Sequence, residues 1–249
     1  MQSALDQFRI GISRVRDLIA LHNSVKAQAT GVLDVSDILR AALVLAVSAL
    51  DYYVHEVVTL GMVEIHRGQR SEPTPLANTT QSTFSRFQVS LGGARQERLA
   101  ALDIASWLET EIQKTHGYGF LLQPYTIADL IPAISASVVK RLDSTSWLED
   151  EIRERLGYQS FQQADKIAEA IRYVSDQKLW DELANKIGKS AKNLKQQLNS
   201  IVDRRNKIAH EADIDPTFNL GNRWYIDELL VSDAVDFIEQ LVESIHQIL

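Results

Sequence analysis

The chain has no cysteine among its 249 residues. This absence excludes disulfide bonds, cysteine-ligated zinc sites, iron–sulfur clusters and thiol nucleophiles. The chain also has only five prolines and eleven glycines, so little interrupts long helices. The longest uninterrupted apolar run, residues 41–47, is far shorter than the roughly 20 residues of a membrane span. The N-terminus lacks the basic-then-apolar pattern of a signal peptide, and we expect a cytoplasmic protein.

The composition that remains is that of an ordinary globular protein, 45% hydrophobic and 24% charged. Such a chain can bury a sizeable core, and its length fits one large domain or two small ones. Acidic residues outnumber basic ones by 33 to 26, which gives a net charge of −7. The overall balance therefore does not indicate nucleic-acid binding, and charge has to be considered locally.

Apolar residues recur at helical spacing through most of the chain. This pattern predicts a helix over residues 3–28 and a longer, largely buried helix over residues 35–67. Two more are predicted near the C-terminus, one over residues 190–212 and one that begins at Ser232. Only residues 223–231 are compatible with a strand. We therefore predict an all-α fold, an up-and-down helical bundle.

The middle of the chain contains an internal repeat at an offset of 40 residues. Residues 102–131 and 142–171 share the pattern LD..SWLE.EI....GY followed by IA..I. Each copy predicts a helix that starts at a serine with a capping box and ends at a glycine, followed by a second short helix. We interpret the repeat as a duplicated helical hairpin inserted into a single domain; an ancient duplication without functional content is the simpler explanation of it. The predicted domain spans residues 1–249, with outer helices at 3–67 and 190–249 and the insertion at about 81–187.

Positive charge is concentrated in one segment. Residues 186–207 carry seven basic residues and one acid, so this stretch is +6 while the rest of the chain is −13. A basic helix on an acidic protein is typical of a face that binds a polyanion; a solvated helix face is the alternative. The candidate residues of this stretch for contacts with a polyanion are Lys189, Lys192, Lys195, Arg204 and Lys207.

Arg205 stands out on the same predicted helix. At 100° per residue it lies in line with apolar residues such as Leu198 and Ile208, and a guanidinium facing an apolar surface needs a partner or an anion. His210 lies one turn after Asn206, about 140° around the helix from Arg205. A histidine near a helix end can also simply satisfy the last carbonyls.

These residues carry a resemblance to a known family. Arg205, Asn206, three residues and then His210 resemble the arginine–x(4–6)–histidine signature of HEPN domains. More narrowly, the chain resembles the RiboL-PSP-HEPN family in three strings: IVDRRNKIAHEADIDP (201–216), SFQQADKIAEAI (160–171) and LVLAVSALDYYVHE (43–56). The resemblance covers the two outer thirds and the second repeat copy, and it is weakest over residues 68–140.

The resemblance implies a helical bundle that dimerises so that the helices carrying arginine and histidine meet. It implies a metal-independent endoribonuclease of phage defence, of a toxin–antitoxin pair or of RNA turnover, with Arg205 and His210 as its catalytic pair. His210 would move protons in the attack of a ribose 2′-OH on the adjacent phosphorus, and Arg205 would bind the phosphate. The products would carry 2′,3′-cyclic phosphate and 5′-OH ends. One helix does not easily aim two side chains 140° apart at one phosphate, so we expect a homodimer through residues 190–212, with an antitoxin or regulatory protein as a further partner.

The sequence leaves two roles open for each of three further residues. Asn206 could orient the phosphate or His210. Arg204 either binds the phosphate or pairs with an acid. Asp51, inside an apolar run, needs a cationic partner, for which Arg204 or Arg205 is the first hypothesis and a purely structural ion pair the alternative.

Other chemical motifs are incomplete. Residues 188–190 end like a phosphate-binding P-loop, but Leu183 stands where the loop needs glycine. His55 and Glu56 begin like a zincin helix, but Thr59 replaces the second ligand. We therefore predict no metal and no organic cofactor. A catalytically inactive HEPN module that binds RNA or a protein is the main alternative to the nuclease, and a helical scaffold is the third.

Overall fold

The computed structural model describes residues 1–28, 34–74, 109–110, 112–124, 126–143, 146–217 and 221–249. Within these residues the secondary structure is helical and contains no strand, so the predicted all-α class is confirmed. The helices are α1 (Gln2–Gln28), α2 (Ser36–His66), the short 3₁₀ helix η1 (Phe120–Leu122), α5 (Ile127–Asp143), α6 (Ser146–Gly157), α7 (Ala164–Ile171), α8 (Leu179–Ile187), α9 (Ala191–Glu211) and α10 (Glu228–Ile248).

The chain divides into two compact units. The first contains residues 1–86 and 156–249, and the second contains residues 87–155. Helices α7 and α8, which the sequence analysis places in the insertion, belong to the first unit together with the outer helices. The organisation as a single domain stays a prediction.

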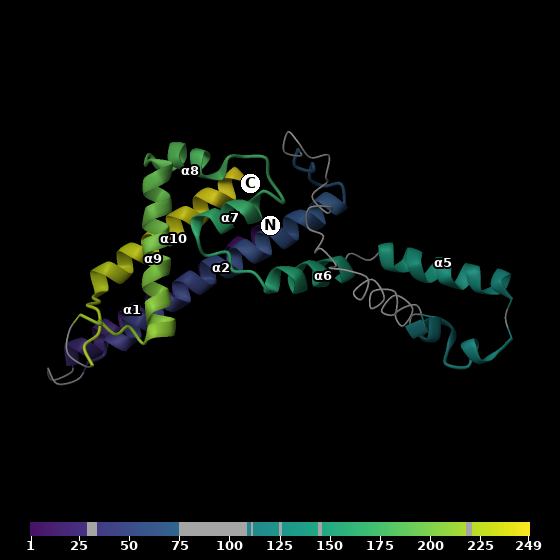
Figure 1. The fold of residues 1–249 in the computed structure, drawn as a ribbon, viewed down its shortest axis with the longest axis horizontal. Helices are drawn as coiled ribbons and strands as arrows, with labels where there is room; N and C mark the ends of the chain where they lie inside the picture. Colours follow the sequence, from purple (N-terminus) through teal and green to yellow (C-terminus); the bar gives the residue numbers. More distant parts are fainter. Residues whose placement is uncertain (29–33, 75–108, 111, 125, 144–145, 218–220) are drawn as a thin grey trace. The chain divides into compact units, whose positions relative to one another are not determined.

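The core of the first unit lies between α1, α2 and α10, which pack against one another (Figure 1). Every third or fourth residue of α1 is buried, as its apolar stripe predicts. Helix α2 is buried on most of its circumference because α1, α7, α9 and α10 all contact it. The ring of Phe8 meets the edge of the Tyr53 ring at a centroid distance of 5.9 Å, and both residues are fully buried. These contacts make α2 the central helix of the first unit.

Helix α9 crosses α2, while α7 and α8 lie beside it (Figure 1). Its inner face is formed by Leu194, Leu198 and Val202. Ile208, one of the apolar residues in line with Arg205, is only half-buried. This crossing places the C-terminal half of α9 beside the N-terminal half of α2, where Ile208 and Ala212 line a pocket together with Ala41.

Helix α2 is also long and apolar enough to cross a membrane by length and composition. Half of its most apolar 18-residue stretch is buried inside the structure. The core helix of a bundle passes the same test, and the packing of α2 described above is that of a core helix.

The starts of the last two helices test the sequence predictions directly. Ser190 caps α9 as predicted, since its side chain accepts a hydrogen bond from the Asn193 N–H at 3.1 Å. The predicted cap of the terminal helix at Ser232 is wrong. The cap is Asp227, whose carboxylate accepts the Leu230 N–H at 2.8 Å, and this bond lowers the pKa of the carboxyl. The helix therefore begins at Glu228, and a strand over residues 223–231 is wrong as well.

The second unit contains η1, α5 and most of α6. The predicted helix of the second repeat copy is present as α6, which spans Ser146–Gly157. The start of the first copy, residues 102–108, lies outside the described residues, while its predicted end at Gly117 fits a φ of 84° there. The helices that follow the two copies differ in length, since α5 has 17 residues and α7 has 8. The duplicated hairpin therefore stays a prediction.

Candidate active site

The residues of the predicted catalytic motif line one cleft. Arg205, Asn206 and His210 project from α9 into a hollow of about 520 Å³. The opposite wall comes from the loop before α7 and from the first turn of that helix. The remaining lining residues are Gln159, Ser160, Gln162, Gln163, Lys166 and Val202.

The arrangement differs from the sequence expectation in one respect. The helical wheel suggested that one chain does not easily direct Arg205 and His210 to a single phosphate. The curved wall formed by residues 159–166 lets both side chains border the same cleft within one chain. A second subunit is therefore not required to bring them to one cleft, and the homodimer stays a prediction.

The cleft has an unusual charge composition for an acidic protein. Its lining contains two basic side chains, Arg205 and Lys166, and the imidazole of His210, but no carboxylate. Lys166 also pairs with Glu169 at 2.6 Å, on the exposed side of α7. A cleft lined by one sign of charge attracts the opposite sign. Its chemistry therefore fits an anion such as a phosphate group.

Arg205 is held without a carboxylate. Its Nη2 donates a hydrogen bond to the side-chain oxygen of Gln162. Its Nε is buried and has no hydrogen-bond partner in the described part of the chain. A buried donor without a partner costs about 1–3 kcal/mol. The Arg205 guanidinium therefore has one unsatisfied donor and no carboxylate that compensates its charge.

Arg204, the neighbouring residue, has the opposite environment. Both of its terminal nitrogens bind the carboxylate of Asp213, and Nη2 also donates to the backbone oxygens of Trp224 and Tyr225 at 3.2 Å each. Asp213 is fully buried and also accepts the Nε of Arg40 at 2.6 Å. Of the two alternatives for Arg204, the structure places it in an ion pair on the far side of α9 from the cleft.

The ion pairs of Asp213 fix the turn that follows His210. Ala212 and Asp213 have φ values of 51° and 59°, a left-handed conformation that L-residues other than asparagine and aspartate seldom adopt. The Asp213 N–H donates to the Lys207 oxygen at 3.0 Å, which closes the end of α9. Arg40 and Arg204 therefore anchor the helix end that carries His210.

Asp51 does not pair directly with either arginine. Its carboxylate accepts the Phe161 N–H at 2.6 Å and the side-chain N–H of Gln162 at 2.8 Å. The imidazole of His55 lies 3.7 Å away. Gln162 stands between Asp51 and Arg205, which is why the predicted direct ion pair does not form.

The lysines of the basic stretch are not brought into the cleft. Lys207 lies over the Trp224 ring at 4.5 Å, on the side of α9 that also holds Arg204. Lys195 pairs with Asp165 at 3.0 Å, and Lys189 donates to Gln197 at 3.3 Å. Lys192 is exposed near the start of α9. These side chains surround other parts of α9, and the only lysine of the cleft lining is Lys166, from α7.

Sequence reasoning gave no role to the wall opposite α9. Ser160, Gln162, Gln163 and Lys166 all lie in the string 160–171 that carries part of the family resemblance. That string was a signal for this wall, but glutamines have no spacing rule that indicates an active site. Their placement needed the tertiary contact between α7 and α9.

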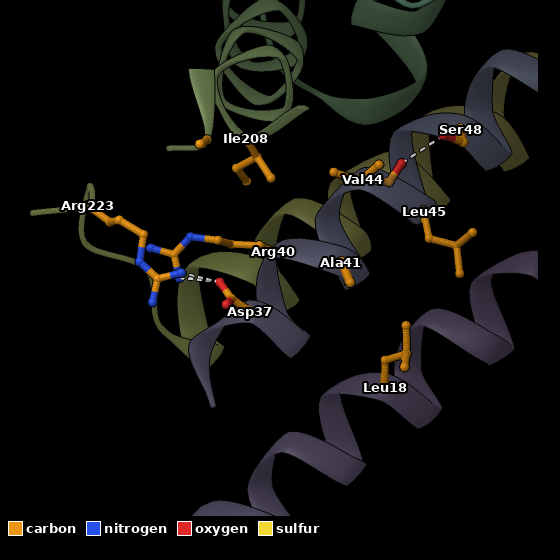
Figure 2. A pocket seen from close by; sticks show the side chains of 10 residues that line it. Leu18, Asp37, Arg40, Ala41, Val44, Leu45, Ser48, Ile208 and Arg223 are labelled. Atoms are coloured by element: carbon orange, nitrogen blue, oxygen red, sulfur yellow. Dashed lines mark hydrogen bonds and ion pairs between the residues drawn. The ribbon is translucent and has the colours of Figure 1, made fainter. Parts of the chain in front are cut away.

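A second and larger pocket lies on the other side of α9 and has different chemistry. It has a volume of about 640 Å³ and an apolar floor that includes Leu18, Leu45 and Ile208 (Figure 2). At one end Arg223 pairs with Asp37, and Arg40 lies 3.6 Å from the same carboxylate (Figure 2). Its cations are compensated by acids, so this pocket is less suited to phosphate than the cleft with Arg205. Among the described residues, no three histidine, aspartate or glutamate side chains are grouped as a metal site requires.

A family model matches the C-terminal part of the chain. Residues 103–249, more than half of the chain, match the RiboL-PSP-HEPN family model. The chain belongs to the RiboL-PSP-HEPN family. The matched range contains Arg205, His210 and the whole opposite wall of the cleft, while the string 43–56 and Asp51 lie before it. None of the curated proteins and none of the solved structures compared with the chain matches it.

Proposed function

We propose that this HEPN protein is a metal-independent endoribonuclease whose active site is the cleft of Arg205, Asn206 and His210. The observation that carries the proposal is the lining of this cleft. It combines an arginine held by a neutral amide, a histidine and a lysine, and it contains no carboxylate. Family membership supports the same activity, because HEPN domains are often ribonucleases.

The proposed chemistry uses the two residues in different roles. His210 accepts the proton of a ribose 2′-OH, and the 2′-oxygen forms a bond to the adjacent phosphorus. Arg205 binds the non-bridging oxygens and stabilises the charge that develops on them. The bond between phosphorus and the 5′-oxygen breaks, and the leaving oxygen takes up a proton from water or from the protonated His210. The products are a 2′,3′-cyclic phosphate and a 5′-OH end.

The other candidate residues have secondary roles in this proposal. Asn206 lies one turn before His210 and is half-buried in the cleft, where it can orient the phosphate or the imidazole. Lys166 gives a second contact with the RNA backbone inside the cleft. The exposed Lys189 and Lys192 and the half-buried Lys195 and Lys207 contribute sequence-independent attraction of the strand. Arg204 has no such role because Asp213 compensates its charge.

The proposed activity is tested with purified protein and mixed RNA in EDTA. We expect cleavage by the wild type and a loss of at least about 100-fold in His210→Ala and in Arg205→Ala, the usual size of general-base and oxyanion-stabilising effects. Undiminished cleavage by both variants would show a contaminating nuclease and contradict the proposal. RNA binding without cleavage by the wild type would favour an inactive binding module.

We also propose that two copies pair through α9, as the family resemblance implies. The end of this helix, with Ala209, His210 and Ala212, is exposed in the single chain and is available to a second copy. Sedimentation at micromolar concentration is expected to give a dimer. A monomer that still cleaves RNA would contradict the pairing and would leave the single-chain cleft as the active site. The family resemblance further implies that the nuclease acts in phage defence, in a toxin–antitoxin pair or in RNA turnover.

A further inference from the structure

The contacts of Gln162 connect the candidate active site to the central helix. Its side-chain N–H donates to Asp51 of α2 at 2.8 Å, and its side-chain oxygen accepts the Nη2 of Arg205. A carboxylate can only accept hydrogen bonds and a guanidinium can only donate them. The amide between them can therefore adopt only one orientation, with nitrogen toward Asp51 and oxygen toward Arg205.

Asp51 is itself fixed in place. One carboxylate oxygen accepts the Phe161 N–H at 2.6 Å, so the backbone next to Gln162 is held by the same group as its side chain. The Phe161 ring is buried against the imidazole of His55 at a centroid distance of 4.7 Å. Backbone, ring and amide together give Gln162 little freedom to rotate. The loop before α7 is thus tied to α2 at the position where it contacts Arg205.

The adjacent Arg204 has a direct carboxylate partner, which Arg205 lacks. Arg204 is held by the carboxylate of Asp213, which neutralises it. Arg205 is held by a neutral oxygen, and its negative counter-charge at Asp51 is one side chain further away. The guanidinium is thereby oriented while its charge remains available to a ligand.

We propose that Gln162 is a positioning residue of the RNA-binding cleft: with Asp51 it forms a relay that orients the Arg205 guanidinium without compensating its charge. This inference rests on the proposed function of the cleft. It assigns to Asp51 an indirect role, because Asp51 fixes the amide and the amide fixes Arg205. It also explains how the Asp51 carboxylate on α2 helps to orient Arg205 without contacting it.

Exchanging the charges of Asp51 and Gln162 tests the orientation of the Arg205 guanidinium separately from the compensation of its charge. Gln162→Glu places a carboxylate beside Asp51, and Asp51→Asn places a second donor beside the Gln162 amide, so each single variant breaks the contact. In the double variant Asp51→Asn/Gln162→Glu, the new asparagine accepts the Phe161 N–H and donates to the new glutamate, which still accepts from Arg205. The geometry is restored, but Arg205 now has a direct carboxylate partner. Gln163→Glu adds the same charge to the cleft wall without touching Asp51 and is the matched control.

We expect both single variants to have a lower melting temperature than the wild type and the double variant to recover it. Cleavage of RNA, and affinity for an uncleavable 2′-O-methyl strand, should both stay at least about 10-fold below the wild type in the double variant. The control Gln163→Glu should lose less than that.

Recovery of activity and affinity together with the melting temperature would overturn the inference, because the relay would then be purely structural. A double variant that stays as unstable as the singles would overturn it too, because the contact with Asp51 would not be the link. A wild type that binds the 2′-O-methyl strand but cleaves no RNA would refute the proposed nuclease instead. The affinities of the variants would still decide the relay.

Discussion

Replacing Asp213 with alanine is expected to lower the free energy of unfolding by about 3–5 kcal/mol, the usual effect of removing one member of a buried ion cluster. Asp213 is fully buried, and Arg40, whose own exposure is 6%, donates to the same carboxylate as Arg204. Without this carboxylate, two guanidinium groups remain close together with no acid between them. The measurement is the urea unfolding midpoint of the purified variant.

The matched control is Asp203→Ala. Asp203 lies on the same helix but is exposed, so its removal should change the free energy of unfolding by less than about 0.5 kcal/mol. Asp213→Asn retains the shape and one acceptor, and should fall between the two. A loss below about 1 kcal/mol in Asp213→Ala would contradict the central role that we give to this cluster in fixing the end of α9.

Replacing the two adjacent arginines is expected to give opposite results. Arg205→Met should abolish cleavage, with a loss of at least about 100-fold, while the free energy of unfolding stays equal or rises. A rise is expected because the substitution removes a buried Nε without a partner. Arg204→Met should lower the free energy of unfolding by about 3 kcal/mol, because Asp213 loses one of its two cations.

Each of these variants is the control for the other, since both remove one positive charge from the same turn of α9. Unfolding curves and cleavage rates measured at a temperature where both variants are folded distinguish the effects. Equal losses of activity at equal stability would contradict the assignment of one arginine to the cleft and the other to the fold.

Helices with a continuous apolar stripe were predictable from the sequence. The bounds of α1, α2 and α9 agree with the prediction to within one or two residues, because burial of one face decides these helices. The start of α10 was missed because the prediction placed it at Ser232, whereas Asp227, a residue of an equally good capping type, caps the helix. Capping patterns alone do not choose between such candidates.

The candidate site was predictable only along α9. Arg205, Asn206 and His210 belong to one local pattern, so a sequence motif can find them. The partners of the charged residues could not be found this way. Asp213 follows Arg204 by nine residues and Asp51 lies on a different helix, and only the tertiary fold determines that Asp213 binds Arg204 while Asp51 binds the Gln162 amide. The same holds for Lys166, which a different helix brings into the cleft.

The most direct test of the central claim uses a short RNA that the wild-type protein cleaves at one site. A matched strand carries a single 2′-deoxy nucleotide on the 5′ side of that bond, and both strands are incubated in EDTA. The proposed attack by the 2′-oxygen predicts that the RNA yields a 2′,3′-cyclic phosphate and a 5′-OH, and that the substituted strand stays intact at this bond. His210→Ala should leave both strands intact. Cleavage of the substituted bond, or products that end in a 3′-OH, would contradict the account.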